Sequence, residues 1–291
     1  MSSVFKTADG ALAFRGGFDS HALSQPVARA ERRRLTRVSS EPRFRSVTAE
    51  LRRQSRPALL VSVMKRWMAT RPRGSVQIAM LRSKSSDRSV STETPEDEIV
   101  AQASRLWLGG PSRWRYEVDV PGGATAVYVT DGALWWSYAP SIHAHSNESA
   151  PDRYPGQREH QEWQLFHPEE VLGALRVTST RLDKRAGRSV EIVEAVAHES
   201  DHVPSLPSGA DSYHLVIDRD RGIALRMAAS ADGVEFSSVE ITSLEMDLPL
   251  APELFRIELP AGMAFTPPPV HMPRPTLLRR MLGRLHFGPR D

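Results

Sequence analysis

Residues 106–140 constrain the fold more than any other stretch, because apolar and polar side chains alternate there between turn residues. Residues 113–120 read Arg-Trp-Arg-Tyr-Glu-Val-Asp-Val, and Asp131-Gly132 separates two further alternating runs. A period of two is typical of a strand with one buried face, and Asp-Gly tolerates the positive φ angles of a tight hairpin turn. The stretch also holds four of the six tryptophans. It therefore predicts a meander of antiparallel strands with one aromatic face.

The same pattern continues on both sides of this meander. We predict strands at residues 76–80, 99–108, 113–120, 126–130, 134–138, 176–182, 189–197, 212–218, 223–229, 234–245 and 254–259. Residues 44–54 fit an opening strand or a short helix equally well, whereas residues 83–98 and 141–161 are polar and predict loops. The expected fold class is mainly β (α+β): a curled antiparallel sheet that forms an incomplete barrel, with helices covering its concave face.

Three helices are expected. Residues 58–71 place apolar side chains at helical spacing between Pro57 and Pro72, and residues 168–175 carry Leu172 and Leu175 on one side. Residues 277–285 form a third amphipathic segment with arginines on the polar side. The first and third helices have basic faces, so each fits either docking on the sheet, with its cations solvated, or contact with an anionic membrane.

Charge is segregated along the chain. Residues 1–90 hold 19 Lys/Arg against 6 Asp/Glu, a net charge of +13; residues 91–269 hold 14 against 28, or −14; residues 270–291 hold 5 against 1, or +4. We expect a basic, disordered arm at 1–41, a folded domain at 42–266, and a Pro-rich basic tail with a short amphipathic helix at 267–291. The arms suit either an anionic partner surface or the acidic body itself.

Composition excludes several classes of function. The chain has no cysteine, so disulfides, thiolate metal sites and cysteine nucleophiles are excluded. No apolar run reaches the roughly 18 residues of a membrane-spanning helix. No signal peptide is visible, so we expect a cytoplasmic protein as the sequence stands, and a cell-envelope protein if the true start lies upstream. No motif for reading nucleic acid accompanies the arginines, and nucleic acid is not an expected partner.

Four motifs, in order, resemble one protein family. They are Leu-Trp-Leu-x-x-Pro-x-x-Trp-Arg-Tyr-Glu at 106–117, Val-Thr-Asp-Gly-x-x-x-Trp-x-Tyr-x-Pro at 129–140, the strand-turn-strand at 217–226, and Leu-Phe-x-x-x-x-Pro-x-Gly at 254–262. Together they resemble the LolA-type lipoprotein carriers and the related RseB/MucB regulators over residues 44–266. The resemblance implies a half-barrel whose apolar concave face lies under a helical lid and holds acyl chains. The carriers' lid-latching arginine, just before the motif proline, is replaced here by Gly110.

An apolar ligand site is expected on the aromatic face. Alternation puts Trp114, Tyr116 and Val118 on one side of their strand. We expect the neighbouring strands to add their apolar side chains to that face, and the lid implied by the resemblance to cover it. The ligand-contacting residues predicted in this way are Trp114, Tyr116, Val118, Val127, Val129, Leu134, Trp136, Tyr138, Leu172 and Leu175. The alternative is a filled core in which the same side chains pack against one another.

Other kinds of site have weaker support in the sequence. His143, His145, His160 and His167 gather around the loop at 141–161 without the fixed spacing of a metal site, and no metal or cofactor is predicted. Ser137 lies in no nucleophile motif, so no catalytic residue is predicted either. The expected function is a non-enzymatic binding protein for a lipid-like or acylated apolar ligand; the expected partner is an apolar small molecule, a lipid or an acylated protein. The alternative is an RseB-like sensor that acts through a regulatory protein partner, and a hydrolase is the third hypothesis.

Overall fold

A computed structural model gives the fold of much of the chain. It describes residues 4–6, 30, 33–35, 44–69, 98–110, 112–120, 123–140, 142–149, 161–198 and 206–267. The strand predicted at 76–80, the helix predicted at 277–285, and nearly all of the loop predicted at 83–98 lie outside these residues.

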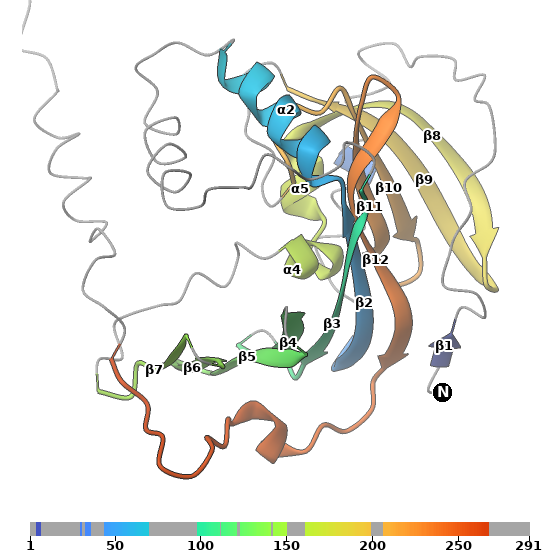
Figure 1. The fold of residues 1–291 in the computed structure, drawn as a ribbon. Helices are drawn as coiled ribbons and strands as arrows, with labels where there is room; N and C mark the ends of the chain where they lie inside the picture. Colours follow the sequence, from blue (N-terminus) through green and yellow to red (C-terminus); the bar gives the residue numbers. More distant parts are fainter. Residues whose placement is uncertain are drawn as a thin grey trace, which may run out of the picture.

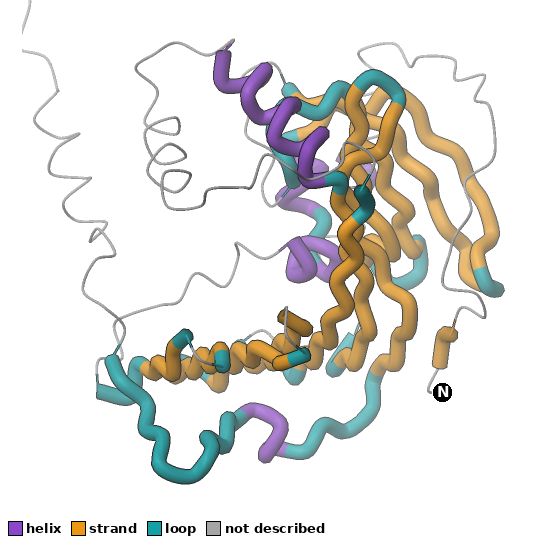
Figure 2. Tube along the Cα trace, in the orientation of Figure 1, coloured by secondary structure: helices purple, strands orange, loops and turns teal. Residues whose placement is uncertain are grey.

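One antiparallel sheet dominates the described chain (Figures 1 and 2). Its strands are β1 Val4–Lys6, β2 Val47–Ser55, β3 Val100–Leu108, β4 Arg113–Val120, β5 Ala124–Asp131, β6 Leu134–Ala139, β7 His143–Ser146, β8 Leu175–Arg185, β9 Arg188–Ala197, β10 Ser212–Asp218, β11 Ile223–Ala231 and β12 Val234–Met246. They pair in the order β7-β6-β5-β4-β3-β2-β12-β11-β10-β9-β8, and β1 pairs with β12. Because β7 and β8 do not meet, the sheet is not closed into a barrel, as the sequence predicted.

Tight turns account for most of this meander. Gly132 and Ala133 connect β5 to β6, and the φ of Gly132 is +67°. Asp232 and Gly233 connect β11 to β12 with φ angles of +51° and +76°. Two consecutive positive φ angles match the right-handed twist of the flanking strands, and Asp-Gly adopts them at little cost. Local chemistry therefore sets these hairpins.

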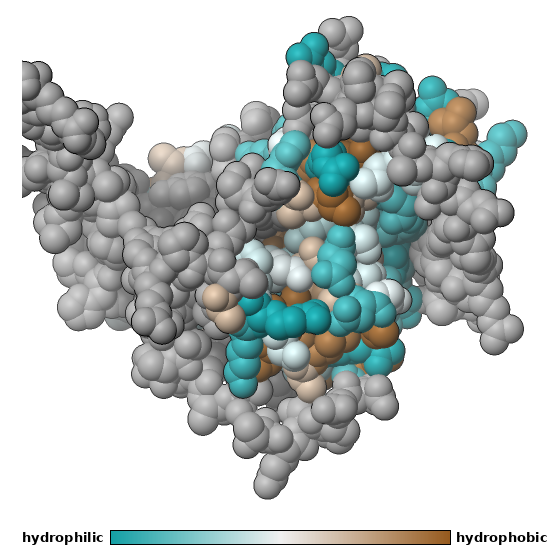
Figure 3. Space-filling model, turned by 90° about the horizontal axis from the view of Figure 1, so that it is seen from above, coloured by the Kyte–Doolittle hydropathy of each residue, from teal (hydrophilic) through white to brown (hydrophobic). Residues whose placement is uncertain are grey.

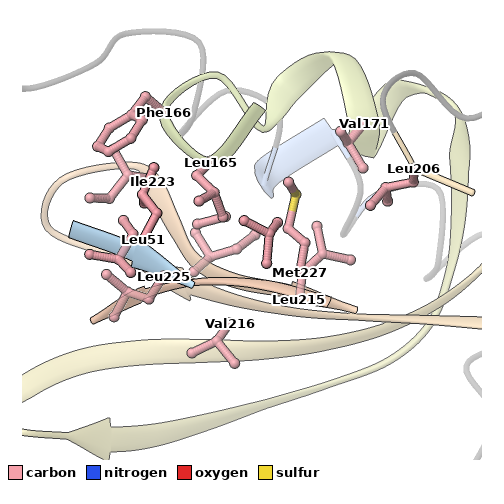
Figure 4. Packing of buried hydrophobic residues seen from close by; sticks show 14 of the residues in the cluster. Leu51, Leu165, Phe166, Val171, Leu206, Leu215, Val216, Ile223, Leu225 and Met227 are labelled. Carbon is pink, nitrogen blue, oxygen red and sulfur yellow. The ribbon is translucent and has the colours of Figure 1, made fainter. Parts of the chain in front are cut away.

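The helices lie on one face of the sheet, within its bend (Figure 1). They are α2 Pro57–Ala69, α4 Gln161–Phe166 and α5 Glu169–Gly173. We call the face that carries them the inner face and the opposite one the outer face. Leu165, Phe166 and Val171 are fully buried; Leu165 and Val171 point toward the side chains of the sheet around Leu215 and Met227, and Phe166 lies beside Ile223 (Figure 4). Each such side chain contributes roughly 1.5–3 kcal/mol through removal from water, so these contacts hold α4 and α5 to the sheet.

The chain after β12 returns across the outer face. We call residues 248–267 the strap; it contains a short 3-10 helix, η2 Pro252–Phe255, and passes beside β4–β7 (Figure 1). The strand predicted at 254–259 is therefore wrong. Its apolar residues do not alternate against a paired strand, because Phe255 is fully buried against side chains of β5 and β6.

Two short parts of the basic arm contact the sheet. Val4–Lys6 pairs antiparallel with residues 243–245 of β12. Arg34 forms an ion pair with the buried carboxylate of Glu191, and Leu35 belongs to the main core. The expectation of disorder does not hold for these residues, and the Arg34–Glu191 contact agrees with the alternative in which the arm lies on the acidic body. The domain limits at 42–266 stay a prediction.

Candidate functional site

The inner face of β3–β5 is aromatic, and the strand register shows which side chains share it. Trp114, Tyr116 and Val118 lie on this face, with exposed fractions of 4%, 5% and 8%. In the register between β4 and β5, Trp114 lies opposite Thr130 and Tyr116 opposite Tyr128. The two tyrosine ring centroids are 6.1 Å apart. Because directly opposite residues project from the same face, Tyr128 and Thr130 belong to this surface.

Half of the predicted ligand-contacting residues lie on the other face. Val127 pairs with Glu117 and Val129 with Arg115, so both valines project outward. The register of β5 and β6 carries the remaining three residues, Leu134, Trp136 and Tyr138, to the same outer face. The prediction that all of them share a surface with Trp114 is therefore wrong. A shift of one residue moves every side chain of a strand to the opposite face. In β5 and β6 the odd-numbered and the even-numbered side chains are both apolar enough to be buried, so the sequence did not indicate which of them share a face with Trp114.

The strap explains why the outer face is also apolar. Val129, Trp136 and Phe255 form a second buried cluster, with residues of the strap packed around it. Arg115 donates hydrogen bonds from Nη1 to the carbonyl oxygens of Leu254 (3.0 Å) and Arg256 (2.9 Å). The far end of the strap pairs with β7, where Thr266 N donates to Ala144 O at 3.0 Å. The outer face is thus covered by the chain itself.

Leu172 and Leu175 lie at the other end of the core. Both side chains are fully buried, Leu172 in α5 and Leu175 at the start of β8. They belong to the main core cluster together with Trp114 and Tyr116. However, α5 packs against β8, whereas β4 lies across the sheet (Figure 1). A role for these leucines as ligand contacts stays a prediction, and the structure gives them a packing role.

Helix α4, which the sequence did not predict, packs on β11 and β12 and reaches the aromatic face through Glu162. Its Glu162 has a side chain only 2% exposed and forms an ion pair with Arg53 of β2, with Oε1 and Nη2 2.6 Å apart. Tyr116 lies within hydrogen-bonding reach of Glu162 and of Ser104 on β3. Burial raises the pKa of Tyr116 far above its ordinary value, and the negative charge of Glu162 adds to the rise. The tyrosine therefore stays neutral at every physiological pH.

A helix at this position leaves a faint trace in the sequence. Glu162-Trp163-Gln164-Leu165-Phe166 places Glu162 one helical turn from Leu165 and Phe166, with Pro168 two residues after the last turn. Six residues are too few for hydrophobic periodicity to stand out from the polar loop before them. Glu162 is also charged, and a charged residue does not normally mark the buried face of a helix. Its burial becomes understandable only when its ion-pair partner, Arg53 of β2, is known.

Helix α2 docks at one end of the inner face, as one of the two alternatives predicted. Val63 is fully buried, and Trp67 packs so closely on Gly209 that a Cβ at that glycine would lie 2.6 Å from the Trp67 Cβ. Arg66 forms an ion pair with Asp232 in the β11–β12 turn, at 2.9 Å. Seen from above, apolar and polar side chains of the described residues are mixed over this side (Figure 3). Membrane contact by α2 stays a prediction.

His143 and His145 lie in the edge strand β7. Among the described residues, no group of His, Asp or Glu side chains could hold a metal ion. His143 and His145 stack with ring centroids 4.9 Å apart, and His143 Nε2 is 2.7 Å from Ser137 Oγ. Burial, together with the neighbouring His145, lowers the pKa of His143. His145 Nδ1 lies 3.1 Å from Thr266 Oγ1. These contacts join β6, β7 and the strap, where the sequence predicted only a loop.

The other two histidines do not extend this group. His160 lies outside the described residues, and His167 stacks on Trp163 at 4.4 Å. Within the part of the chain that the structure describes, no helix is long and apolar enough to cross a membrane.

Comparison with known proteins gives structural likeness at low sequence identity. No protein-family model matches the sequence, and no curated protein matches it. An uncharacterized conserved protein from Thermus thermophilus is similar over 82% of this chain and 99% of its own, at 10% identity and a TM-score of 0.44. A LolA superfamily protein from Nitrosomonas europaea is similar over 77% of this chain and 97% of its own, at 9% identity and a TM-score of 0.33.

The MucA/MucB complex of Pseudomonas aeruginosa gives a third likeness, at 12% identity and a TM-score of 0.41. It covers 80% of this chain and 61% of the matched one, so the chain spans about three fifths of that protein. LolA-superfamily and MucB proteins are thus among the solved structures to which this chain is similar. Identities and TM-scores this low assign neither ligand nor partner.

Proposed function

We propose that this protein is a non-enzymatic binding protein for a lipid-like or acylated apolar ligand. The ligand lies on the inner face, between β3–β5 and α4. One observation carries the proposal: Trp114, Tyr116 and Tyr128 share one aromatic face, and Glu162, from a six-residue helix that an ion pair tethers to β2, borders this face at Tyr116. Aromatic rings provide a large apolar contact area and one polar atom each, which suits an amphiphilic ligand.

The Arg53–Glu162 pair makes α4 a cover that opens more easily than a packed core would. Breaking this pair exposes two charged groups to water, and water hydrates both well. Arg53 is already about one third exposed, whereas Glu162 is buried. Lifting α4 therefore returns a desolvated carboxylate to solvent, which offsets part of the cost of uncovering Leu165 and Phe166.

The experiment that tests this proposal is native mass spectrometry of gently purified, full-length protein, followed by organic extraction of the bound material. We expect a co-purifying fatty acyl compound, phospholipid or acylated peptide in stoichiometric amount. A protein that carries nothing, and that also fails to bind an apolar fluorescent probe such as N-phenyl-1-naphthylamine, would contradict the proposal and favour a filled core.

A second candidate function is a regulatory module that acts through a protein partner. The observation that favours it is β8, an eleven-residue edge strand with β9 as its single strand partner among the described residues. Leu182 on this edge is 64% exposed, and Arg176, Arg181 and Lys184 are exposed beside it. An extended acidic segment of a partner fits such an edge. Pull-down with wild type and with Leu182→Pro tests it, since proline blocks strand pairing; capture that is equal for both would exclude this edge.

A further inference from the structure

The inner face contains buried polar atoms that packing alone does not explain. Thr130 is 1% exposed, and its Oγ1 has no hydrogen-bond partner among the described residues. Its register places it between Trp114 on β4 and Trp135 on β6. A buried hydroxyl without a partner is destabilising, and native proteins rarely keep one unless a water or a ligand satisfies it.

Glu162 adds acceptor capacity over the same face. Its two carboxylate oxygens offer about four lone-pair sites. Arg53 contacts one oxygen, and the Tyr116 hydroxyl lies within reach. Tyr116 is adjacent to Tyr128, and Thr130 is the next residue of β5 on the same face, opposite Trp114. The carboxylate and the hydroxyl therefore belong to one aromatic surface, at successive positions along it. The rise in the pKa of Tyr116, caused by burial and then by Glu162, agrees with a negative potential there.

We propose that the inner face selects apolar ligands whose polar group donates a hydrogen bond, such as a long-chain amide or alcohol, over ligands that end in a free carboxylate. This inference rests on the proposed function and assigns the ligand class. An amide N–H or a hydroxyl can donate to the free lone pairs of Glu162, and Thr130 Oγ1 offers a second, neutral hydrogen-bonding group on the same face. A fatty-acid carboxylate has no proton to donate at neutral pH, and a second negative charge beside a buried carboxylate is repelled.

Thr130 and Glu162 have separate roles in this scheme. Thr130 contributes a neutral hydrogen bond, so it strengthens binding of any hydroxyl or amide ligand. Glu162 contributes charge, so it sets the discrimination against carboxylates. Because the two side chains come from different elements, β5 and α4, they can be changed independently.

The test uses full-length protein and four sixteen-carbon compounds: hexadecane, hexadecanol, palmitamide and palmitate. Each compound is titrated against protein-bound N-phenyl-1-naphthylamine at pH 7.5, at concentrations below the compound's solubility limit or critical micelle concentration, and displacement of the probe is measured. We expect palmitamide and hexadecanol to displace the probe at concentrations at least about tenfold lower than palmitate, the ratio that one buried polar mismatch produces.

Two variants separate the roles. Thr130→Val is expected to weaken palmitamide and hexadecanol about fivefold and to leave hexadecane unchanged. Glu162→Gln is expected to bring palmitate within about threefold of palmitamide. Thr48→Val and Glu50→Gln make the same substitutions on β2, at outer-face positions that pair with Trp107 and Arg105, and are expected to change none of the ratios.

The outcomes are distinct. Equal displacement by palmitate and palmitamide in the wild type, or a preference that Glu162→Gln leaves intact, would overturn the inference while the proposed function stands. Failure of the probe and of all four compounds to bind would overturn the proposed function, and the inference with it. If Glu162→Gln does not fold, as judged by circular dichroism, the Thr130→Val series decides: unchanged affinity for hexadecanol and palmitamide would overturn the inference.

Discussion

The two faces of strands β4–β6 are both apolar, but they are covered in different ways. On the outer face the strap closes over Val129 and Trp136, and its carbonyl groups accept hydrogen bonds from Arg115. On the inner face the short helix α4, tethered through Arg53 and Glu162, borders the aromatic side chains at Tyr116. The strap is continuous with β12 and is hydrogen-bonded to the sheet at Leu254, Arg256 and Thr266, whereas the inner face holds the hydroxyl of Thr130 without a partner among the described residues. Burial alone therefore does not distinguish a binding face from a structural one; the polar atoms do.

The largest expected effect is loss of the outer cover. Phe255→Ala removes a fully buried ring that packs against Val129, Trp136 and Gly109. We expect it to lower the free energy of unfolding by about 3–5 kcal/mol, because a large cavity forms. Urea denaturation measures this, with exposed Met263→Ala on the same strap as the control, expected within about 0.5 kcal/mol. A loss below about 1 kcal/mol for Phe255→Ala would mean that the strap does not stabilise the sheet.

The next effect concerns the tether of α4. Arg53→Met leaves the buried Glu162 carboxylate without its cation, so we expect a loss of about 3 kcal/mol. The double variant Arg53→Met/Glu162→Leu removes both charges and is expected to recover most of that loss. Urea denaturation of the two variants checks this. If the double variant is as unstable as the single one, packing of α4 depends on contacts other than this ion pair.

The strands and turns of the sheet could be predicted from the sequence, but which side chains lie on the inner face and which on the outer face could be predicted only in part. The strands and the Asp-Gly turns were predictable because their signals are local, and alternation in β4 correctly set Trp114 and Tyr116 against Arg113 and Arg115. In β6, Leu134-Trp135-Trp136-Ser137-Tyr138 is apolar on both faces: Trp135 is buried on the inner face, and the strap packs against Trp136 on the outer face. A strand buried on both faces loses its alternation, so the inner and outer sets could not be separated.

Contacts from distant segments account for the other omissions. Glu162 is buried because Arg53, more than one hundred residues earlier, lies opposite it. Strand β7 is only four residues long, and Thr266 of the strap pairs with it. Neither partner is visible from local periodicity, so α4 and β7 were missed within a stretch that looks like a polar loop.

A smaller effect, on the pH dependence of stability, is expected on the outer face of β9 and β10, where Glu194 and His214 are largely buried. Burial raises the pKa of Glu194 to about 7, and burial lowers that of His214 to about 4; the two side chains are 3.7 Å apart. Between pH 4.5 and 7 the folded state holds the Glu194 proton more tightly than the unfolded chain, so this group makes stability fall as pH rises. His214 acts oppositely between pH 4 and 6.5.

Glu194→Gln removes the carboxyl group, and with it the decrease in the free energy of unfolding that this group causes as pH rises. We expect the variant to gain about 2 kcal/mol relative to wild type between pH 4.5 and pH 8, with most of the change below pH 7; this is less than the full pKa shift would give, because the carboxyl is partly exposed and water screens it. Urea denaturation of both proteins across this range measures the difference. A difference between variant and wild type that stays constant with pH would show that Glu194 ionises in the folded protein as it does in the unfolded chain.

The smallest effect concerns the docking of α2. Gly209→Ala places a Cβ against Trp67 at a φ of +88°, and we expect a loss of about 1–2 kcal/mol together with faster hydrogen exchange in α2. Gly123→Ala, at a φ of +76° in open space, is the matched control for backbone strain alone. Equal effects of the two substitutions would mean that the Trp67 contact does not hold α2 in place.

The most direct test of the central claim compares one tryptophan from each face. Titration of N-phenyl-1-naphthylamine into wild type, Trp114→Ala and Trp136→Ala, each verified as folded by circular dichroism, measures where an apolar ligand binds. If the inner face is the binding face, Trp114→Ala weakens probe binding at least about tenfold and Trp136→Ala leaves it nearly unchanged. Unchanged binding in Trp114→Ala, or a loss confined to Trp136→Ala, would contradict the account.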